Sequence, residues 1–293
     1  MNRVMAPRRS RRRPPALEAP AADDDGVTFK SHLDGSMHRF DPEISMRIQH
    51  QIGADIIFSF DELTTLHHSY DYQVGSLDHR THPWAVQSLE WHQKLTSERK
   101  DMPYQALFGV VQGAQHEDLR RKSAQFIGSL DFDGFGLGGA LTKDQMGDIV
   151  RWMVEELPED KPRHMLGISE PDDIFTCIEN GADTFDCVSP ARVGRNGALY
   201  TLTGRINITN ARYNEDFAPV DPSCDCYTCA HYTKAYLNHL FRTGELLSNT
   251  LATIHNERFI VKLVDDIRAS INNDTFEHLK TTWLARYYQN SVE

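Results

Sequence analysis

Three cysteines lie close together and have the spacing of a metal site. Cys224, Cys226 and Cys229 are followed by His255, which falls in a segment of helical periodicity. Three thiolates and one imidazole form the closed tetrahedral set that zinc prefers, with no open position for a catalytic water. The sequence therefore predicts one structural zinc ion, and His231 and His239 remain alternatives for the fourth ligand.

A single carboxylate, Asp186, lies among apolar residues in the segment Thr-Phe-Asp-Cys-Val, at the end of a predicted strand. A partly desolvated carboxylate can attack an anomeric carbon and form a covalent glycosyl-enzyme intermediate. The alternative is an aspartate that binds backbone amides or caps the next helix. The residue types alone leave both interpretations open.

Three further polar positions follow other predicted strands and together could bind the edge of a purine. The carboxylate of Asp61 can accept from a ring N–H and an amine, while the Gln112 amide and the Gly139 N–H can donate to a carbonyl. Each also has a structural explanation, since Gly138–Gly139 could form a tight turn. Arg192 and Arg195, just after Asp186, could hold phosphates or form surface ion pairs.

These residues belong to an alternation of short apolar runs and amphipathic segments that begins at Gly26. In a parallel β/α barrel, the polar groups after each strand open onto one face. An open, flavodoxin-like sheet would also gather strand ends, so the alternation alone does not separate the two folds. The expected strands are 54–60, 106–111, 135–137, 164–168 and 184–185, and the expected helices are 84–97, 117–130 and 143–156.

The pattern changes beyond Asp186. Residues 198–208 predict a hairpin with its turn at Thr203–Gly204, and two amphipathic helices are expected at about 251–272 and 275–288. A barrel needs eight strands, whereas the segment from Gly26 supplies only about five before the hairpin. Either strands are hidden in the pattern, or the chain starts late.

Composition narrows the class of protein. With 40% hydrophobic and 10% aromatic residues the chain can bury a sizeable core, and no apolar run approaches the roughly 20 residues of a membrane helix. An odd number of cysteines and no apolar leader favour a soluble, cytoplasmic protein. The net charge of -11 does not exclude nucleic acid, because phosphate binding depends on a local basic surface.

The first 25 residues have a different composition and are expected to form a disordered tail. A run of arginines is followed by Pro, Ala and Asp, with no apolar periodicity. The run could bind RNA or simply remain solvated. Residues 26–293 are expected to form the barrel domain, with a zinc-binding subdomain at about 210–260.

In order along the chain, these motifs resemble those of the queuine tRNA-ribosyltransferases, or tRNA-guanine transglycosylases, of bacterial type. The resemblance runs from Gly26 to about Tyr288. The matching segments are 26–36, 53–62, 107–113, 167–173, 184–188, 192–197, 221–229 and 253–256.

The resemblance implies a TIM (β/α)8 barrel in which Asp186 is the nucleophile and Asp61, Gln112 and Gly139 hold the purine. Guanine at the wobble position of a tRNA with a G-U-N anticodon would leave, and a 7-deazaguanine base, 7-aminomethyl-7-deazaguanine or queuine, would replace it. The resemblance also implies a homodimer and assigns Cys224, Cys226, Cys229 and His255 to zinc. The residues it assigns to RNA contact are Gly167, Ile168, Ser169, Glu170, Pro171, Asp172, Asp173, Ala191, Arg192, Val193, Gly194 and Arg195.

Three departures from the family pattern bear on activity. An Asp-Ser-Gly-Gly motif, which supplies the general acid/base in the family, normally precedes the Gly26 segment and is not found in this sequence. Leu63 stands where bacterial members usually have cysteine, and the loop 140–145 is shorter than usual. A catalytically inactive, zinc-containing tRNA-binding or partner subunit is therefore the alternative function.

Overall fold

A parallel sheet of five strands forms the centre of the computed structural model, which describes residues 21–99 and 102–289. Each strand pairs with the next one along the chain, whereas a doubly wound sheet would depart from chain order. The order is that of a (β/α)8 barrel, and the barrel prediction is confirmed for this part of the sheet. The strands are β4 (Ile56–Phe58), β5 (Ala106–Val111), β6 (Gly134–Leu137), β7 (Arg163–Met165) and β8 (Thr184–Phe185).

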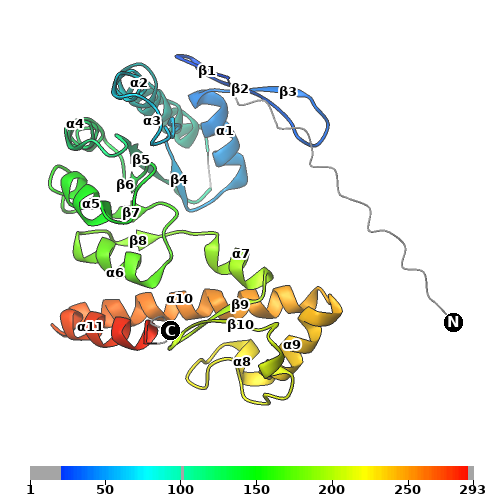
Figure 1. Ribbon diagram of the computed structural model, residues 1–293. Coiled ribbons are helices and arrows are strands. Elements are labelled where there is room, and N and C mark those ends of the chain that lie inside the picture. Colours follow the sequence, from blue (N-terminus) through cyan, green and yellow to red (C-terminus); the bar gives the residue numbers. More distant parts are fainter. Residues whose placement is uncertain (1–20, 100–101, 290–293) are drawn as a thin grey trace.

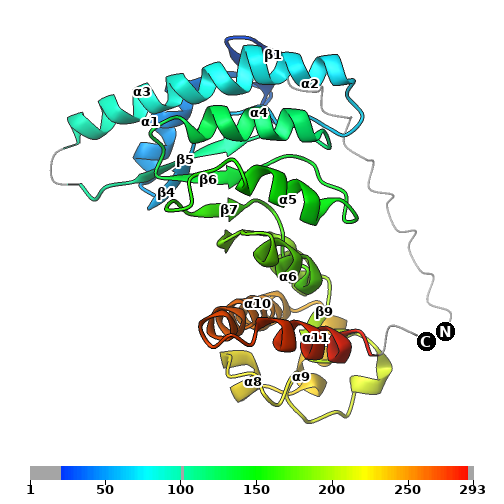
Figure 2. The same cartoon turned by 90° about the vertical axis from the view of Figure 1, so that its left-hand side faces the viewer.

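One layer of helices covers the outer side of this sheet (Figures 1 and 2). A helix lies between each strand and the next, as right-handed parallel crossovers require. The loop after β4 first forms a short helix, α2 (Tyr70–Ser76), and a π-helical turn, Leu77–Thr81. The covering helices are α3 (His82–Glu98), α4 (Glu117–Gly128), α5 (Met146–Val154) and α6 (Pro171–Glu179).

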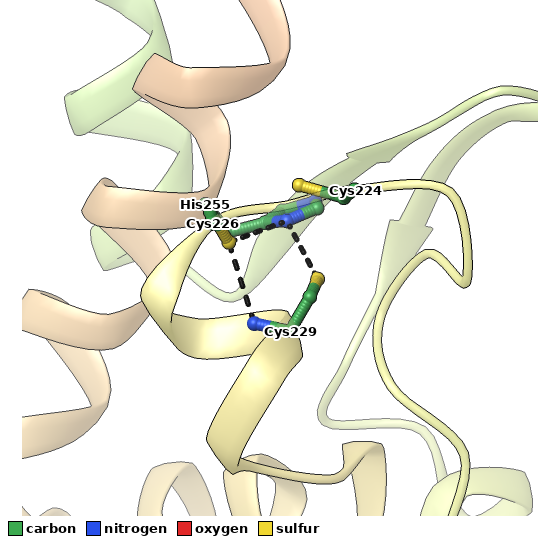
Figure 3. Close-up of side chains that lie close together, drawn as sticks. All are labelled: Cys224, Cys226, Cys229 and His255. Carbon is green, nitrogen blue, oxygen red and sulfur yellow. Dashed lines mark hydrogen bonds between the residues drawn. The ribbon is translucent and has the colours of Figure 1, made fainter.

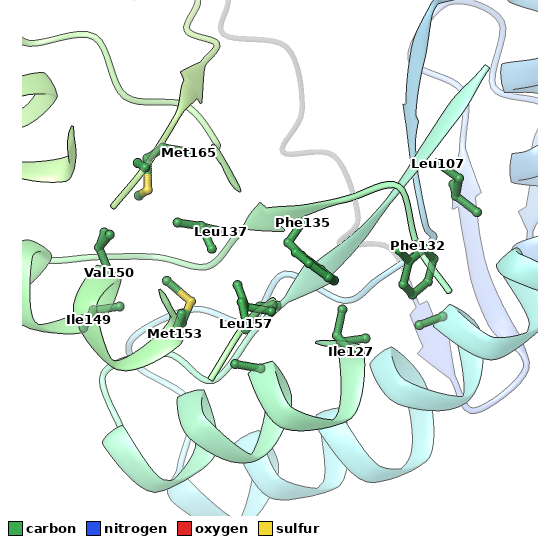
Figure 4. Packing of buried hydrophobic residues seen from close by; sticks show 14 of the residues in the cluster. Leu107, Ile127, Phe132, Phe135, Leu137, Ile149, Val150, Met153, Leu157 and Met165 are labelled. Atoms are coloured by element: carbon green, nitrogen blue, oxygen red, sulfur yellow. The ribbon is translucent and has the colours of Figure 1, made fainter. Parts of the chain in front are cut away.

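The main hydrophobic core lies between the strands and this helical layer (Figure 4). Phe135 and Leu137 of β6 are fully buried against Ile127 of α4 and Met153 of α5. The central strands β5 and β6 are buried almost throughout, and β5 is a continuous apolar run, as expected for a parallel strand covered on both faces. Packing is close, since a Cβ at Gly134 would come within 2.5 Å of the Phe108 ring.

A small antiparallel sheet precedes the barrel strands. Its first strand lies within residues 1–25, which were expected to form a disordered tail, so that prediction was wrong for residues 21–25. It contains β1 (Ala21–Asp23), β2 (Gly26–Lys30) and β3 (Met37–Phe40), and is followed by α1 (Pro42–Ile52). Arg39 donates to both carboxylate oxygens of Asp23, and Trp84 Nε1 donates to the Asp24 carbonyl 2.7 Å away. Residues 21–25 are therefore structured, while the arginine run lies outside the described residues.

The C-terminal part begins with α7 (Ser189–Arg195) and the hairpin of β9 (Ala198–Thr201) and β10 (Gly204–Asn207). The hairpin prediction was wrong by one residue at its turn. Thr201 pairs with Gly204, so the turn residues are Leu202 and Thr203, and Gly204 adopts its positive φ of 104° where the return strand begins. The remaining elements are the 3-10 turn Ala211–Tyr213, α8 (Tyr227–His231), α9 (Lys234–Thr243), α10 (Leu247–Asn272) and α11 (Phe276–Tyr287).

The long helix α10 joins the barrel strands to the cysteine-containing part of the chain, running beneath α6 and α7 in Figure 1. Its fully buried Asn256 makes three hydrogen bonds to other elements. The amide nitrogen donates to the carbonyls of Pro190 and Ala198, and the side-chain oxygen accepts from Tyr200 N. These bonds fix the position of α7 and β9 on the helix.

No helix in the described part of the chain is long and apolar enough to cross a membrane.

The first residue of α3, His82, is buried in the contact between α3 and α4. Its ring stacks on Phe126 with 4.3 Å between ring centroids, and its Nε2 lies 3.3 Å from Ser123 Oγ. Burial lowers the pKa of His82 to about 4. The folded chain therefore takes up this proton less readily than the unfolded chain, whose histidine pKa is about 6.5.

We expect His82 to make the protein less stable as the pH falls through the window between about 6.5 and 4. At pH 5 the unfolded state binds the extra proton, which lowers the free energy of unfolding by about 2 kcal/mol relative to pH 8. Urea unfolding of the wild type and of His82→Phe at both values measures this difference. Parallel losses of stability in the two proteins would contradict the assignment.

Candidate active site and metal centre

Asp186 is the residue directly after β8, and its carboxylate is 60% exposed. Its Oδ1 lies 3.1 Å from His164 Nε2 and accepts a hydrogen bond from Gly167 N at 3.2 Å. Gly167 can turn its N–H toward Asp186 because its φ is 79°, a conformation that favours glycine. This turn also ends β7 at Met165, three residues before the predicted end of the strand.

His164 links Asp186 to the inner face of the sheet. It lies on β7 opposite Thr184 of β8, and its Nδ1 is 2.8 Å from Thr184 Oγ1. Its ring centroid is 5.5 Å from that of Phe58 on β4. A Cβ at Gly136 of β6 would lie 3.0 Å from the same phenylalanine ring, so Phe58 crosses the concave face of the sheet to reach His164.

The predicted purine-binding residues Asp61 and Gln112 contact each other. Gln112, the residue after β5, is buried, and its Nε2 donates to Asp61 Oδ2 at 2.6 Å. Burial raises the pKa of Asp61 to about 6, and the nearby charge of Glu62 acts in the same direction, while the Gln112 hydrogen bond opposes the rise. The buried Gln112 Oε1 has no partner among the described residues.

Glu62 anchors the loop that carries Asp61. Its carboxylate forms an ion pair with Arg80 Nε at 2.6 Å and accepts hydrogen bonds from Tyr72 OH at 2.8 Å and Ser76 Oγ at 2.5 Å. These partners come from α2 and the π-helical turn. The loop after β4 is therefore tied to the start of the next helix, which limits the movement of Asp61.

Gly139 lies beside the Asp61–Gln112 pair, at the turn after β6. A Cβ at Gly138 would lie 2.9 Å from Gln112 Nε2, and one at Gly139 would collide with the Arg120 guanidinium. The fully buried Arg120 donates to the carbonyls of Gly138 at 2.5 Å and Ala114 at 2.7 Å. Burial lowers its pKa to about 9, and the turn is fixed from beneath by this side chain.

The first predicted RNA segment, 167–173, forms the loop after β7 and the first turn of α6. Its acidic side chains are engaged within the protein: Glu170 forms an ion pair with Arg205 at 2.9 Å, and Asp172 and Asp173 both pair with Lys143. Carboxylates repel phosphates, so the backbone around Gly167 is the part of this segment best suited to RNA. Pro171 begins the helix and is buried.

The second predicted RNA segment, 191–195, lies on α7. Arg192 and Arg195 are exposed, and no ion pair to either is found among the described residues. Gly194 packs against α10, where a Cβ would lie 3.2 Å from Asn256 Nδ2, and Val193 packs in the core beneath. The helix therefore buries one side and presents both arginines on the other.

Asp186 also lines a cavity of about 360 Å³ between β8 and α10. The lining includes Ser169, Cys187, Glu257 and Arg268, but among the described residues it does not include Asp61 or Gln112. From Asp186, contacts on the inner face run through His164 to Phe58 of β4, the strand that leads into the loop carrying Asp61.

The four predicted metal ligands converge (Figure 3). The ligand atoms of Cys224, Cys226, Cys229 and His255 all lie within 4.8 Å of one another, close enough to bind a metal ion. The alternative ligand His231 instead packs on the ring of Tyr227, with 4.7 Å between centroids. The group thus combines the loop before α8 and the first turn of α8 with His255 of α10.

The histidine of this group is oriented by the protein backbone. His255 Nε2 donates to the Tyr200 carbonyl at 2.7 Å, which leaves Nδ1 facing the sulfurs, 3.3 Å from Cys229 Sγ. A carbonyl that fixes the tautomer is the usual support for a metal-bound imidazole. Asp225, between the first two cysteines, forms a two-bond ion pair with Arg258 of α10 and holds the loop against the helix.

Comparison with known proteins agrees with this arrangement. A family model described as queuine tRNA-ribosyltransferase matches residues 10–289. The chain belongs to the queuine tRNA-ribosyltransferase family. It is 47% identical to the queuine tRNA-ribosyltransferase of a Roseiflexus species over 272 residues, which cover 89% of this chain and 68% of that protein.

Two further relatives with the same name are similar to this chain. The Herpetosiphon aurantiacus protein is 44% identical over 90% of this chain and 66% of its own length. The Caldanaerobacter subterraneus protein is 42% identical over 92% of this chain and 71% of its own length. The chain thus spans about two thirds of the length of these family members.

Three residues of the site were not predicted from the sequence. His164 was placed in a strand without a role, and Arg120 and Phe58 were treated as parts of a helix and a strand. Only the pairing of β7 with β8 brings His164 to Asp186. For Arg120, the sequence offered one indication of a special role: it is an arginine on the side of the amphipathic helix α4 that is buried.

Proposed function

We propose that this chain exchanges guanine at the wobble position of tRNA for a 7-deazaguanine base. The observation that carries the proposal is the exposed Asp186 carboxylate at the end of a barrel strand, in a family member whose β4 and β5 carry the Asp61–Gln112 pair after their ends in the same parallel sheet. The names of the relatives favour the enzyme over the inactive subunit.

The base would be held at the Asp61–Gln112 pair. The ionised Asp61 accepts from the ring N–H and the exocyclic amine of guanine, and the second N–H of the Gln112 amide, with the Gly139 N–H, donates to the carbonyl. A base in a loop leaves its stack at a cost of a few kcal/mol, which favours an unpaired anticodon nucleotide. Arg192 and Arg195 would then hold the neighbouring phosphates.

The reaction would proceed in two displacements at the ribose. An oxygen of Asp186 attacks C1′, the bond from C1′ to guanine breaks, and the ribose remains attached to the enzyme as an ester. The 7-deazaguanine then attacks C1′ and releases the carboxylate. Which 7-deazaguanine is accepted depends on the base substituent, near which the exposed Leu63 would lie.

We expect Asp186→Asn to abolish incorporation of labelled guanine into tRNA with a G-U-N anticodon, by at least about 1,000-fold, because the amide cannot form the ester. The covalent tRNA adduct on denaturing gels should be lost as well. Asp183→Asn is the matched control, since an amide oxygen can still accept from Arg163 N. A wild-type chain that binds tRNA without exchange would instead support the inactive-subunit alternative.

Guanine affinity should fall as the pH falls through about 6. Asp61 accepts from the base only when ionised, and its pKa is raised to about 6, so at pH 5 only about one tenth of the carboxylate is available. The KM for guanine is then about tenfold higher at pH 5 than at pH 8. Asp61→Asn should bind guanine weakly at both values, and a KM that does not change with pH would contradict this role.

The metal bound by Cys224, Cys226, Cys229 and His255 is zinc, which prefers this donor set. Four protein ligands leave no open position, so the ion stabilises the loop against α10 and takes no part in base exchange. The homodimer is supported by three neighbouring tyrosines: Tyr227 of α8 meets Tyr232 edge-on, and Tyr232 stacks on Tyr236 of α9. Tyr227 is 54% exposed and Tyr236 40%, so an aromatic surface is open to a second chain.

Metal analysis should find about one zinc per chain, and Cys226→Ala should remove it and lower the temperature of unfolding. Cys177→Ala is the control, because this buried cysteine lies in the main core and is not one of the four ligands. Full zinc content in Cys226→Ala, or no zinc in the wild type, would contradict the assignment.

A further inference from the structure

We propose that His164 and the backbone N–H of Gly167 form a two-donor site that stabilises Asp186 as a leaving group in the second displacement. This inference rests on the proposed function and goes beyond it, because it assigns different roles to the two oxygens of Asp186. Both hydrogen bonds end on Oδ1, and no other described residue donates to Asp186. Oδ2 is therefore the oxygen left open for attack.

The donor role of His164 follows from the chemistry of its partner. An ionised carboxylate only accepts hydrogen bonds, so the Nε2 that lies 3.1 Å from Asp186 Oδ1 carries a hydrogen whether the ring is neutral or protonated. On the other side of the ring, Thr184 Oγ1 can donate to Nδ1 or accept from it at 2.8 Å. The threonine therefore supports the Nε2 donor in either protonation state.

Both donors are held in place by contacts with neighbouring residues. The His164 side chain is only 13% exposed and packs on Phe58. The Gly167 carbonyl accepts from Cys187 Sγ at 3.2 Å, which ties the loop after β7 to the residue that follows Asp186. The two donors are therefore in place before the substrate binds, as electrostatic stabilisation of a developing charge requires.

The two displacements use this site differently. In the first, an electron pair of Oδ2 forms the bond to C1′, the bond from C1′ to N9 breaks, and its pair leaves with guanine, which takes a proton from water. Oδ1 becomes the carbonyl oxygen of the ester. In the second, N9 of the incoming base attacks C1′ and loses its proton to water, and the pair of the C1′–Oδ2 bond returns to the carboxylate.

Negative charge leaves the carboxylate in the first displacement and returns to it in the second. Donors on Oδ1 therefore favour the second displacement, while in the first they orient the nucleophile. Removing one donor should slow breakdown of the ester more than its formation. A residue that only maintained the fold would affect both steps alike.

The test compares both half-reactions in His164→Phe and His164→Gln. Phenylalanine keeps a ring against Phe58 but has no donor, whereas glutamine has an N–H at similar reach. With the phenylalanine variant we expect breakdown of the adduct by a 7-deazaguanine base to slow by about 10- to 100-fold, the value of a lost hydrogen bond to a charged group. Adduct formation and the KM for tRNA should change by less than about threefold.

In rapid-quench experiments, His164→Phe should release a burst of guanine and accumulate the covalent adduct on denaturing gels, and His164→Gln should largely restore the wild-type pattern. Thr184→Val removes the hydroxyl beside His164 Nδ1 with little change of shape. It should also slow breakdown of the adduct relative to its formation, by a smaller factor. This variant keeps the test available if His164→Phe does not fold. Equal slowing of both steps, or no change in either, would overturn the inference. A wild-type chain that forms no adduct would instead refute the proposed function.

Discussion

The parallel pairing of β4 to β8 in chain order is the constraint on which the rest of the structure depends. Because all five carboxyl ends face the same way, the loops that carry Asp61, Gln112, Gly139, Gly167 and Asp186 share one edge of the sheet. Backbone hydrogen bonds set this arrangement, and the side chains then need only short loops to reach one another. The same pairing places His164 against Thr184, from which it reaches Asp186.

Local patterns in the sequence predicted those parts of the site in which the partners are close in sequence or follow strands directly. The cysteine motif predicted the metal group, and β5 was predicted to the residue because an apolar run with clear ends marks it. The two-residue strand β8 was also predicted with the bounds that the structure has. The contact between Asp61 and Gln112 followed from the positions of both residues after adjacent strands.

Contacts between distant segments could not be predicted in this way. Nothing near His164 in the sequence indicates Asp186, since their contact depends on strand register, and the hairpin turn was misplaced because Gly204 was taken as a turn residue. Asp23 joins a strand although its neighbours look like a polar tail, because Arg39, on another strand, supplies its partner. In each case the deciding interaction comes from another element.

Asn256 couples the group that includes His255 to the helix α7 and the strand β9. It follows the metal ligand His255 directly and holds both the beginning of α7 and the strand β9. A rotation of α10 that moves His255 therefore also displaces the helix bearing Arg192 and Arg195. One turn of α10 thus supports both the group that could bind a metal and the helix that presents Arg192 and Arg195.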